Sequence, residues 1–114
     1  AVHHIEAQRF RAMIVRRWRE EVFDKVDVLA MPTTMGAAFP IERSDLSVTF
    51  QLIRNTNPLN LLGIPAVSVP CGFTASRLPI GLQLAGRWWD EQAVLRAAYA
   101  YEQATDFHTL TPPL

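Results

Sequence analysis

Residues 60–86 read N-L-L-G-I-P-A-V-S-V-P-C-G-F-T-A-S-R-L-P-I-G-L-Q-L-A-G and contain two short apolar runs bounded by proline and glycine. Short apolar runs between such turn-forming residues are typical of buried strands. We therefore predict antiparallel strands at 66–69 and 80–85, joined by a loop that contains Gly72 and Arg77.

The two predicted strands give the hairpin unlike faces, because successive side chains of a strand point to opposite sides. One face is bulky and carries Val67, Val69, Ile80, Leu82 and Leu84. The other, called here the small-residue face, carries Ala66, Ser68, Gly81, Gln83 and Ala85. Small side chains let another layer approach closely, so we expect polypeptide from outside these residues to cover this face. Gln83 would then need buried hydrogen-bond partners.

The amino-terminal half is predicted to be helix, strand, loop and helix. A helix over residues 2–24 has an apolar face made of Ile5, Phe10, Ile14, Trp18 and Val22. A short buried strand at 27–31 is stopped by Pro32, and a loop follows over 32–43. Ser44 is expected to cap a second helix that runs to about Arg54, with Leu46, Phe50 and Ile53 on one face.

The stretch N-T-N-P at 55–58 is expected to break that helix, because the residue before a proline is pushed out of helical geometry. After the hairpin, Asp90 is predicted to cap a last helix that runs to about Thr105. Its inward face is expected to carry Val94, Leu95, Ala98 and Tyr101.

Length and composition indicate one piece of globular protein. The 114 residues allow a single domain at most, and 49% hydrophobic with 19% charged residues argues against disorder. The 11 acidic and 11 basic residues cancel, which gives no electrostatic reason to expect a nucleic-acid or membrane partner. The chain begins at Ala1, inside a predicted helix. Such a start is expected of a fragment, of a processed piece, or of a chain whose initiator methionine has been removed.

The lone Cys71 fits a reducing compartment, and we expect a cytoplasmic protein. No apolar run reaches the roughly 20 residues that a membrane helix needs. A metal site is not expected, because His3 and His4 are adjacent and His108 is remote from both. No cofactor is expected either.

No set of residues resembles a complete catalytic site. A thiol nucleophile would use Cys71 with His108 and an acid such as Asp90, but Cys71 lies at a strand end with no helix amino terminus after it. A serine nucleophile with a lysine base would need Lys25, the only lysine of the chain. We therefore predict no catalytic residues here.

The arginine-rich stretch R-F-R-A-M-I-V-R-R-W-R, residues 9–19, has two interpretations. It could contact RNA or phosphate, or it could be a solvated helix face balanced by Glu20 and Glu21. The second interpretation agrees with the absence of net charge.

Three polar residues are candidates for substrate contact: Thr33, Thr34 and Asn60. Thr33 and Thr34 lie just past the carboxyl end of a strand, where open α/β sheets place their ligands. Asn60 follows Pro58 and precedes L-L-G-I-P. The alternative role for all three is purely structural, in loops that such side chains stabilise.

Four ordered blocks resemble the carboxy-terminal portion of the amidase signature family. They are D-V-L-A-M-P-T, N-L-L-G-I-P-A-V-S-V-P-C-G-F, L-P-I-G-L-Q-L-A-G-R and V-L-R-A-A-Y-A-Y-E-Q-A-T. The resemblance implies an α/β/α layered fold with a mixed sheet, of which residues 1–114 would be one carboxy-terminal piece. It also implies amide hydrolysis by two serines and a lysine of a Gly-Ser-rich region, which has no match here. Lys25 is not that lysine.

The resemblance implies that this chain supplies scaffold and part of a substrate pocket, and that alone it is inactive. Family subunits that make glutaminyl- or asparaginyl-tRNA usually have an acidic residue shortly before the second block, whereas here F-Q-L-I-R-N-T-N-P has only Arg54 as a charge. We therefore expect a general amidase acting on a small-molecule amide. The alternative is a non-catalytic truncated relative that forms a homodimer or docks on another protein.

Overall fold

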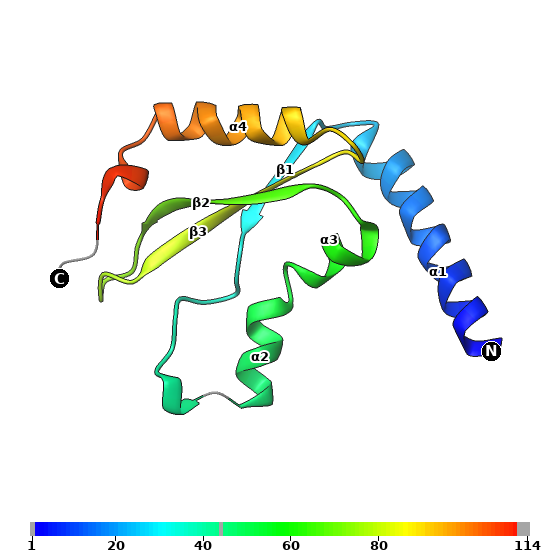
Figure 1. The fold of residues 1–114 in the computed structure, drawn as a ribbon, viewed down its shortest axis with the longest axis horizontal. Helices are drawn as coiled ribbons and strands as arrows, with labels where there is room; N and C mark the ends of the chain where they lie inside the picture. The colour runs from blue at the N-terminus through cyan, green and yellow to red at the C-terminus, as the bar shows by residue number, and fades with distance from the viewer. Residues whose placement is uncertain (1, 44, 112–114) are drawn as a thin grey trace.

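The computed structural model describes residues 2–43 and 45–111, with helices on both sides of a small sheet (Figure 1). The α-helices are α1 (Val2–Trp18), α2 (Leu46–Ile53), α3 (Asn57–Leu62) and α4 (Glu91–Gln103). The strands are β1 (Val28–Pro32), β2 (Ala66–Phe73) and β3 (Pro79–Gly86). A π-helical turn at Arg19–Phe23 continues α1, and 3-10 turns lie at Ile41–Arg43 and Phe107–Thr109. The predicted α/β class is confirmed.

The sheet has the order β1–β3–β2, and both strand pairs are antiparallel. Ser68 lies opposite Gln83 and Val69 lies opposite Leu82, which confirms the predicted hairpin and its two faces. Both strands are longer than predicted, and β2 has a bulge between Pro70 and Gly72. Pro70 is tolerated because β2 is an edge strand and its missing N–H breaks no central ladder.

The bulky face of the sheet is covered by α4, which lies along one side of it in Figure 1. Val94 and Ala98 of α4 are buried against Val69 and Leu84 of the sheet. Asp90 caps the helix as predicted, since its Oδ1 accepts a hydrogen bond from the Ala93 N–H at 3.2 Å. The inward placement of Leu95 was wrong, because Leu95 is 60% exposed.

The small-residue face is covered in part by this chain itself, and here the expectation of an open face was wrong. Ala85 is fully buried and packs with Phe23, Leu59, Leu62 and Ile64. Gln83 is 4% exposed. Ala66 and Ser68 of the edge strand remain exposed. With α4 on one face and α3 on the other, the chain forms an α/β/α arrangement.

The segment between α2 and the hairpin contains a short helix that the sequence pattern did not predict. The chain breaks over residues 54–56, and α3 begins at Asn57 with Pro58 in its first turn, where a missing N–H costs nothing. The expected break at residue 57 therefore comes earlier. Gly63 ends α3 in the left-handed region at φ 71°, which glycine adopts without strain.

The amino terminus of α2 is capped by Asp45, whose Oδ1 accepts hydrogen bonds from the Val48 N–H and the Ser47 hydroxyl. The predicted cap, Ser44, lies outside the described residues. Asp45 is an equally good capping residue one position later.

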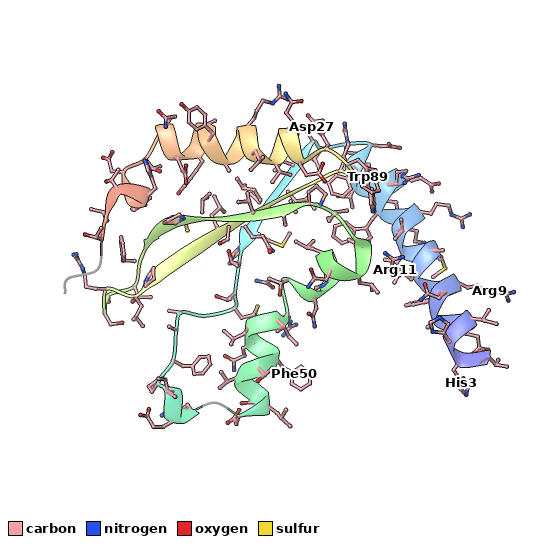
Figure 2. All side chains as sticks on the ribbon, viewed as in Figure 1. His3, Arg9, Arg11, Asp27, Phe50 and Trp89 are labelled. Atoms are coloured by element: carbon pink, nitrogen blue, oxygen red, sulfur yellow. The ribbon has the colours of Figure 1, made fainter. Side chains whose placement is uncertain are left out.

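The outer ends of α1 and α2 project from the sheet, and their apolar faces are not covered by the described residues (Figure 1). Phe10 of α1 is 60% exposed and Phe50 of α2 is 67% exposed, and Figure 2 shows Phe50 pointing outward from its helix. The carboxyl half of α1 packs against the core through Ile14, Val15 and Trp18. The predicted apolar face of the first helix therefore faces inward only in its second half.

Candidate functional site

The two predicted threonines lie where β1 ends, but their side chains do different things. The Thr33 N–H donates a hydrogen bond to the Gly81 carbonyl at 2.9 Å, and its Oγ1 lies 2.5 Å from the Ser68 Oγ. The Thr34 hydroxyl donates to the Gly36 carbonyl at 2.7 Å. Thr33 therefore faces the hairpin, and Thr34 shapes the loop that follows β1.

A hollow of about 230 Å³ lies beside this loop, between the end of β1 and the start of β3. It is lined by Pro32, Thr34, Met35, Gly36, Ala37, Thr74, Ile80 and Gly81. None of these residues carries a charge. The hollow is slightly smaller than ordinary ligand pockets, which begin at about 300 Å³. It has room for a small, mostly apolar group.

Asn60 does not lie at this hollow. It is exposed on α3, where it lines a separate open depression with Arg54, Asn57, Pro58 and Leu61. The structure thus places Thr33 and Thr34 together and Asn60 apart from them. The loop role considered for Asn60 also does not apply, because the residue lies inside a helix.

Asn55 is the asparagine whose side chain organises this region, and sequence analysis did not single it out. Its Nδ2 donates to the Pro32 carbonyl at 2.8 Å, and its backbone carbonyl accepts from Gln83 Nε2 at 3.3 Å. Asn55 therefore joins the end of β1 to the turn between α2 and α3. Gln83, which is buried, therefore has a hydrogen-bond partner, as its place on the small-residue face required, and that partner is half-buried.

Ser68 and Gly81 were also not chosen as site residues. A Cβ added at Gly81 would lie 2.7 Å from the Ser68 Oγ and 2.8 Å from the Thr33 Oγ1, both closer than real contacts allow. The signal in the sequence that points to them is the alternation of small residues on this face, from which the sequence analysis predicts only a packing surface.

Of the remaining candidates, His108 lies in the 3-10 turn beside β2, where it lines a hollow with Pro70 and Phe73. The Asp90 carboxylate caps α4, and Cys71 is a half-buried free thiol at the β2 bulge. Within residues 2–43 and 45–111, no group of three His, Cys, Asp or Glu residues could hold a metal ion. In the same part of the chain, no helix is both long and apolar enough to cross a membrane.

Two residues of the arginine-rich stretch make contacts within the fold. Arg11 Nε donates to the Leu61 carbonyl at 2.7 Å, and the Arg19 guanidinium lies 5.2 Å from the centre of the Trp88 ring. Arg9 is exposed, and Figure 2 shows it on the projecting part of α1. All five arginines of the stretch are exposed, which agrees with the solvated helix face. The contacts of Arg11 with α3 and of Arg19 with Trp88 were not predicted.

Comparison with known proteins gives consistent matches over most of the chain. The family model Amidase matches residues 2–95. The A subunit of glutamyl-tRNA(Gln) amidotransferase from Methanosarcina barkeri is 47% identical in an alignment of 113 positions that covers 97% of this chain and 23% of that protein. The protein of the same name from Roseiflexus sp. is 48% identical over 98% of this chain and 23% of its own length. This chain thus spans less than a quarter of these relatives.

Solved structures agree with these matches. The A subunit of glutamyl-tRNA(Gln) amidotransferase from Thermotoga maritima superposes with a TM-score of 0.78 at 33% identity, over 91% of this chain and 23% of that one. The native peptide amidase from Stenotrophomonas maltophilia superposes with a TM-score of 0.64 at 34% identity, over 93% of this chain and 21% of that one.

Proposed function

Because the chain belongs to the amidase signature family, we propose that the protein containing it hydrolyses carboxamide C–N bonds. The reaction would proceed through an acyl-enzyme formed on a serine outside these 114 residues, with a second serine and a lysine assisting it. This chain supplies scaffold and one wall of the substrate pocket. On its own the chain is inactive. The enzyme that contains it is cytoplasmic and needs no cofactor.

The observation that carries this proposal is the short span of the chain against its relatives. It covers 22–23% of the curated amidotransferase subunits and 21% of the peptide amidase. The exposed apolar faces of α1 and α2 also favour additional polypeptide packed against them. Both facts are expected if this chain is one part of a larger catalytic domain.

The pocket wall in this proposal is formed by Thr33 and Thr34 at the end of β1. Asn60 contributes from α3, on a different part of the surface. Substrate contact by all three residues therefore requires a pocket whose other walls come from the rest of the protein. Thr34 lines the uncharged hollow and Thr33 lies next to it in the chain, which favours these two residues as the substrate-contacting pair.

The substrate class has two candidates. We propose a general carboxamide, because F-Q-L-I-R-N-T-N-P has no acidic residue before the N-L-L-G-I-P block. The second candidate is the substrate of an amidotransferase, in which case the protein would be one subunit of such an enzyme. A specific finding favours it: the curated relatives at 47% and 48% identity carry that name. A protein that releases ammonia from simple amides without any tRNA would support the first candidate.

A different second function is a non-catalytic module that dimerises. The exposed Phe10 and Phe50 favour it, since large exposed apolar patches often mark protein contacts. Sedimentation of the purified chain distinguishes the two functions. A single well-defined dimer at all concentrations would favour the module, whereas graded association would favour an enzyme piece lacking its covering segments.

The test of the main proposal compares the longer protein with these 114 residues alone. We expect the longer protein to release ammonia from butyramide or benzamide, and the 114-residue chain to release none. Cys71→Ala in the short chain is the control for a thiol reaction. Turnover by the short chain that persists through repeated purification and in Cys71→Ala would contradict the proposal.

A further inference from the structure

The hydroxyl groups of Thr33 and Ser68 meet across the central strand of the sheet. Thr33 follows the edge strand β1 and Ser68 belongs to the edge strand β2, while Gly81 of β3 lies between them. Their oxygens are 2.5 Å apart, and an added Cβ at Gly81 would lie within 2.8 Å of both. The contact therefore exists because residue 81 has no side chain.

The pair keeps hydrogen-bonding capacity after making its own bond. Each hydroxyl has one hydrogen and two acceptor lone pairs. One hydrogen is used between Thr33 and Ser68, so the second hydrogen and three lone pairs remain. Ser68 is exposed and Thr33 is half-buried, so the remaining hydrogen can reach a group outside the sheet.

The uncharged hollow adjoins the pair at Gly81, which lines it together with the neighbours of Thr33, Pro32 and Thr34. Met35 and Ile80 make the hollow apolar on either side. A charged group placed there would lose its hydration without gaining an ionic partner, which is strongly unfavourable. The site thus favours a neutral, apolar group with one polar atom at its edge.

Resting on the amide hydrolysis proposed above, we propose that this hollow holds a neutral, apolar part of the substrate and selects small neutral amides. The Thr33–Ser68 pair donates its remaining hydrogen to a polar atom of the substrate at the edge of the hollow. Gly81 sets the size of the hollow and keeps the two hydroxyls in contact. Ser68 and Gly81 are thereby assigned to substrate specificity.

The experiment uses the longer protein that contains this chain, with butyramide and glutamine as the two test amides. We expect butyramide to have the higher kcat/KM, because the zwitterionic glutamine backbone has no ionic partner in the hollow. Thr33→Val and Ser68→Ala should each raise the KM for butyramide about threefold to tenfold, as expected for one lost hydrogen bond, with kcat changed less than about twofold. Gly81→Ala should lower kcat/KM more than either.

Ser47→Ala is the matched control, because its hydroxyl donates to the Asp45 carboxylate at 2.6 Å at the start of α2 and neither residue lines the hollow. Its KM should equal that of the parent. An unchanged KM in both Thr33→Val and Ser68→Ala, with only a lower melting temperature, would overturn the specificity role. So would a preference for glutamine over butyramide.

Failure of the proposed function gives a different result. If the parent protein cleaves no amide, amide hydrolysis itself is refuted, and butyramide binding is then measured by saturation-transfer NMR. Binding by the parent that weakens in Thr33→Val and Ser68→Ala supports the hollow as a site for neutral amides. Absence of binding by the parent overturns the site as well.

Discussion

Gln83 is the residue on which the small-residue face depends. It is nearly fully buried in the central strand, where an amide without partners would cost about 1–3 kcal/mol. Its Nε2 donates to the backbone carbonyl of Asn55, and the side-chain Nδ2 of Asn55 donates to the Pro32 carbonyl at the end of β1. A chain of two amide groups thus fixes the loop that carries Thr33 and Thr34.

Asp45 gives a prediction at the same scale, because hydrogen bonds lower the pKa of its carboxyl group. The Ser47 hydroxyl at 2.6 Å is the larger cause, and the Val48 N–H at 3.0 Å adds to it. A lowered folded-state pKa stabilises the protein above the unfolded value of about 3.9, and this stabilisation is lost as the pH falls through the lowered pKa. We expect the NMR shift of the Val48 amide proton to titrate with an apparent pKa below about 3.9.

The control for this titration is Asp45→Asn, which keeps the capping oxygen and removes the ionisable group. In that variant the Val48 amide signal should show no transition over the same pH range. A transition in the parent at or above the ordinary value of an aspartate would contradict the assignment.

The element that best tests the packing is α4, because sequence and structure disagree about one of its positions. Val94 is buried over Gly86 and Leu84, whereas Leu95 turns to solvent one residue later. Val94→Ala removes two buried methyl groups and should lower the free energy of unfolding by about 2 kcal/mol. Chemical denaturation of the purified chain at fixed concentration measures this change.

Leu95→Ala is the comparison variant, since it truncates a larger side chain that the described residues do not cover. It should change the free energy of unfolding by less than about 0.5 kcal/mol. Equal losses for the two variants would mean that α4 is rotated from the orientation given by the structure.

The whole molecule is more extended than a chain of its length that folds on its own. Its radius of gyration is 16.7 Å, whereas a compact domain of this length has about 13 Å. Its accessible surface is 8587 Å², against about 6300 Å² for a folded monomer of this mass. The excess comes from the projecting α1 and α2, whose outer apolar residues have no cover among the described residues (Figure 1).

This shape predicts that the isolated chain associates in a concentration-dependent way. The double variant Phe10→Ser and Phe50→Ser should reduce the average mass measured by sedimentation and reduce binding of a hydrophobic dye. Tyr99→Ser, which removes an exposed aromatic residue from α4, is the control and should leave both unchanged. A parent chain that stays monomeric at high concentration and binds no dye would contradict this prediction.

Local patterns along the chain were sufficient to predict the hairpin, its two faces and the start of α4. Proline and glycine bound the strands, period-two alternation sorted Gly81 and Gln83 from Leu82 and Leu84, and Asp90 marked the first turn of the helix. These features depend on neighbouring residues and on backbone geometry, which sequence patterns report directly. The four family blocks likewise indicated the fold class, because they extend over most of the chain.

Which helix covers which face became known only from the packing of the folded chain. The short helix α3 buries Ala85, Asn55 rather than Asn60 holds the end of β1, and Thr33 meets Ser68 over Gly81. Each of these contacts joins residues more than 20 positions apart, and their free energy depends on the relative placement of two elements. No local pattern contains that placement, so it emerges only when the elements pack together.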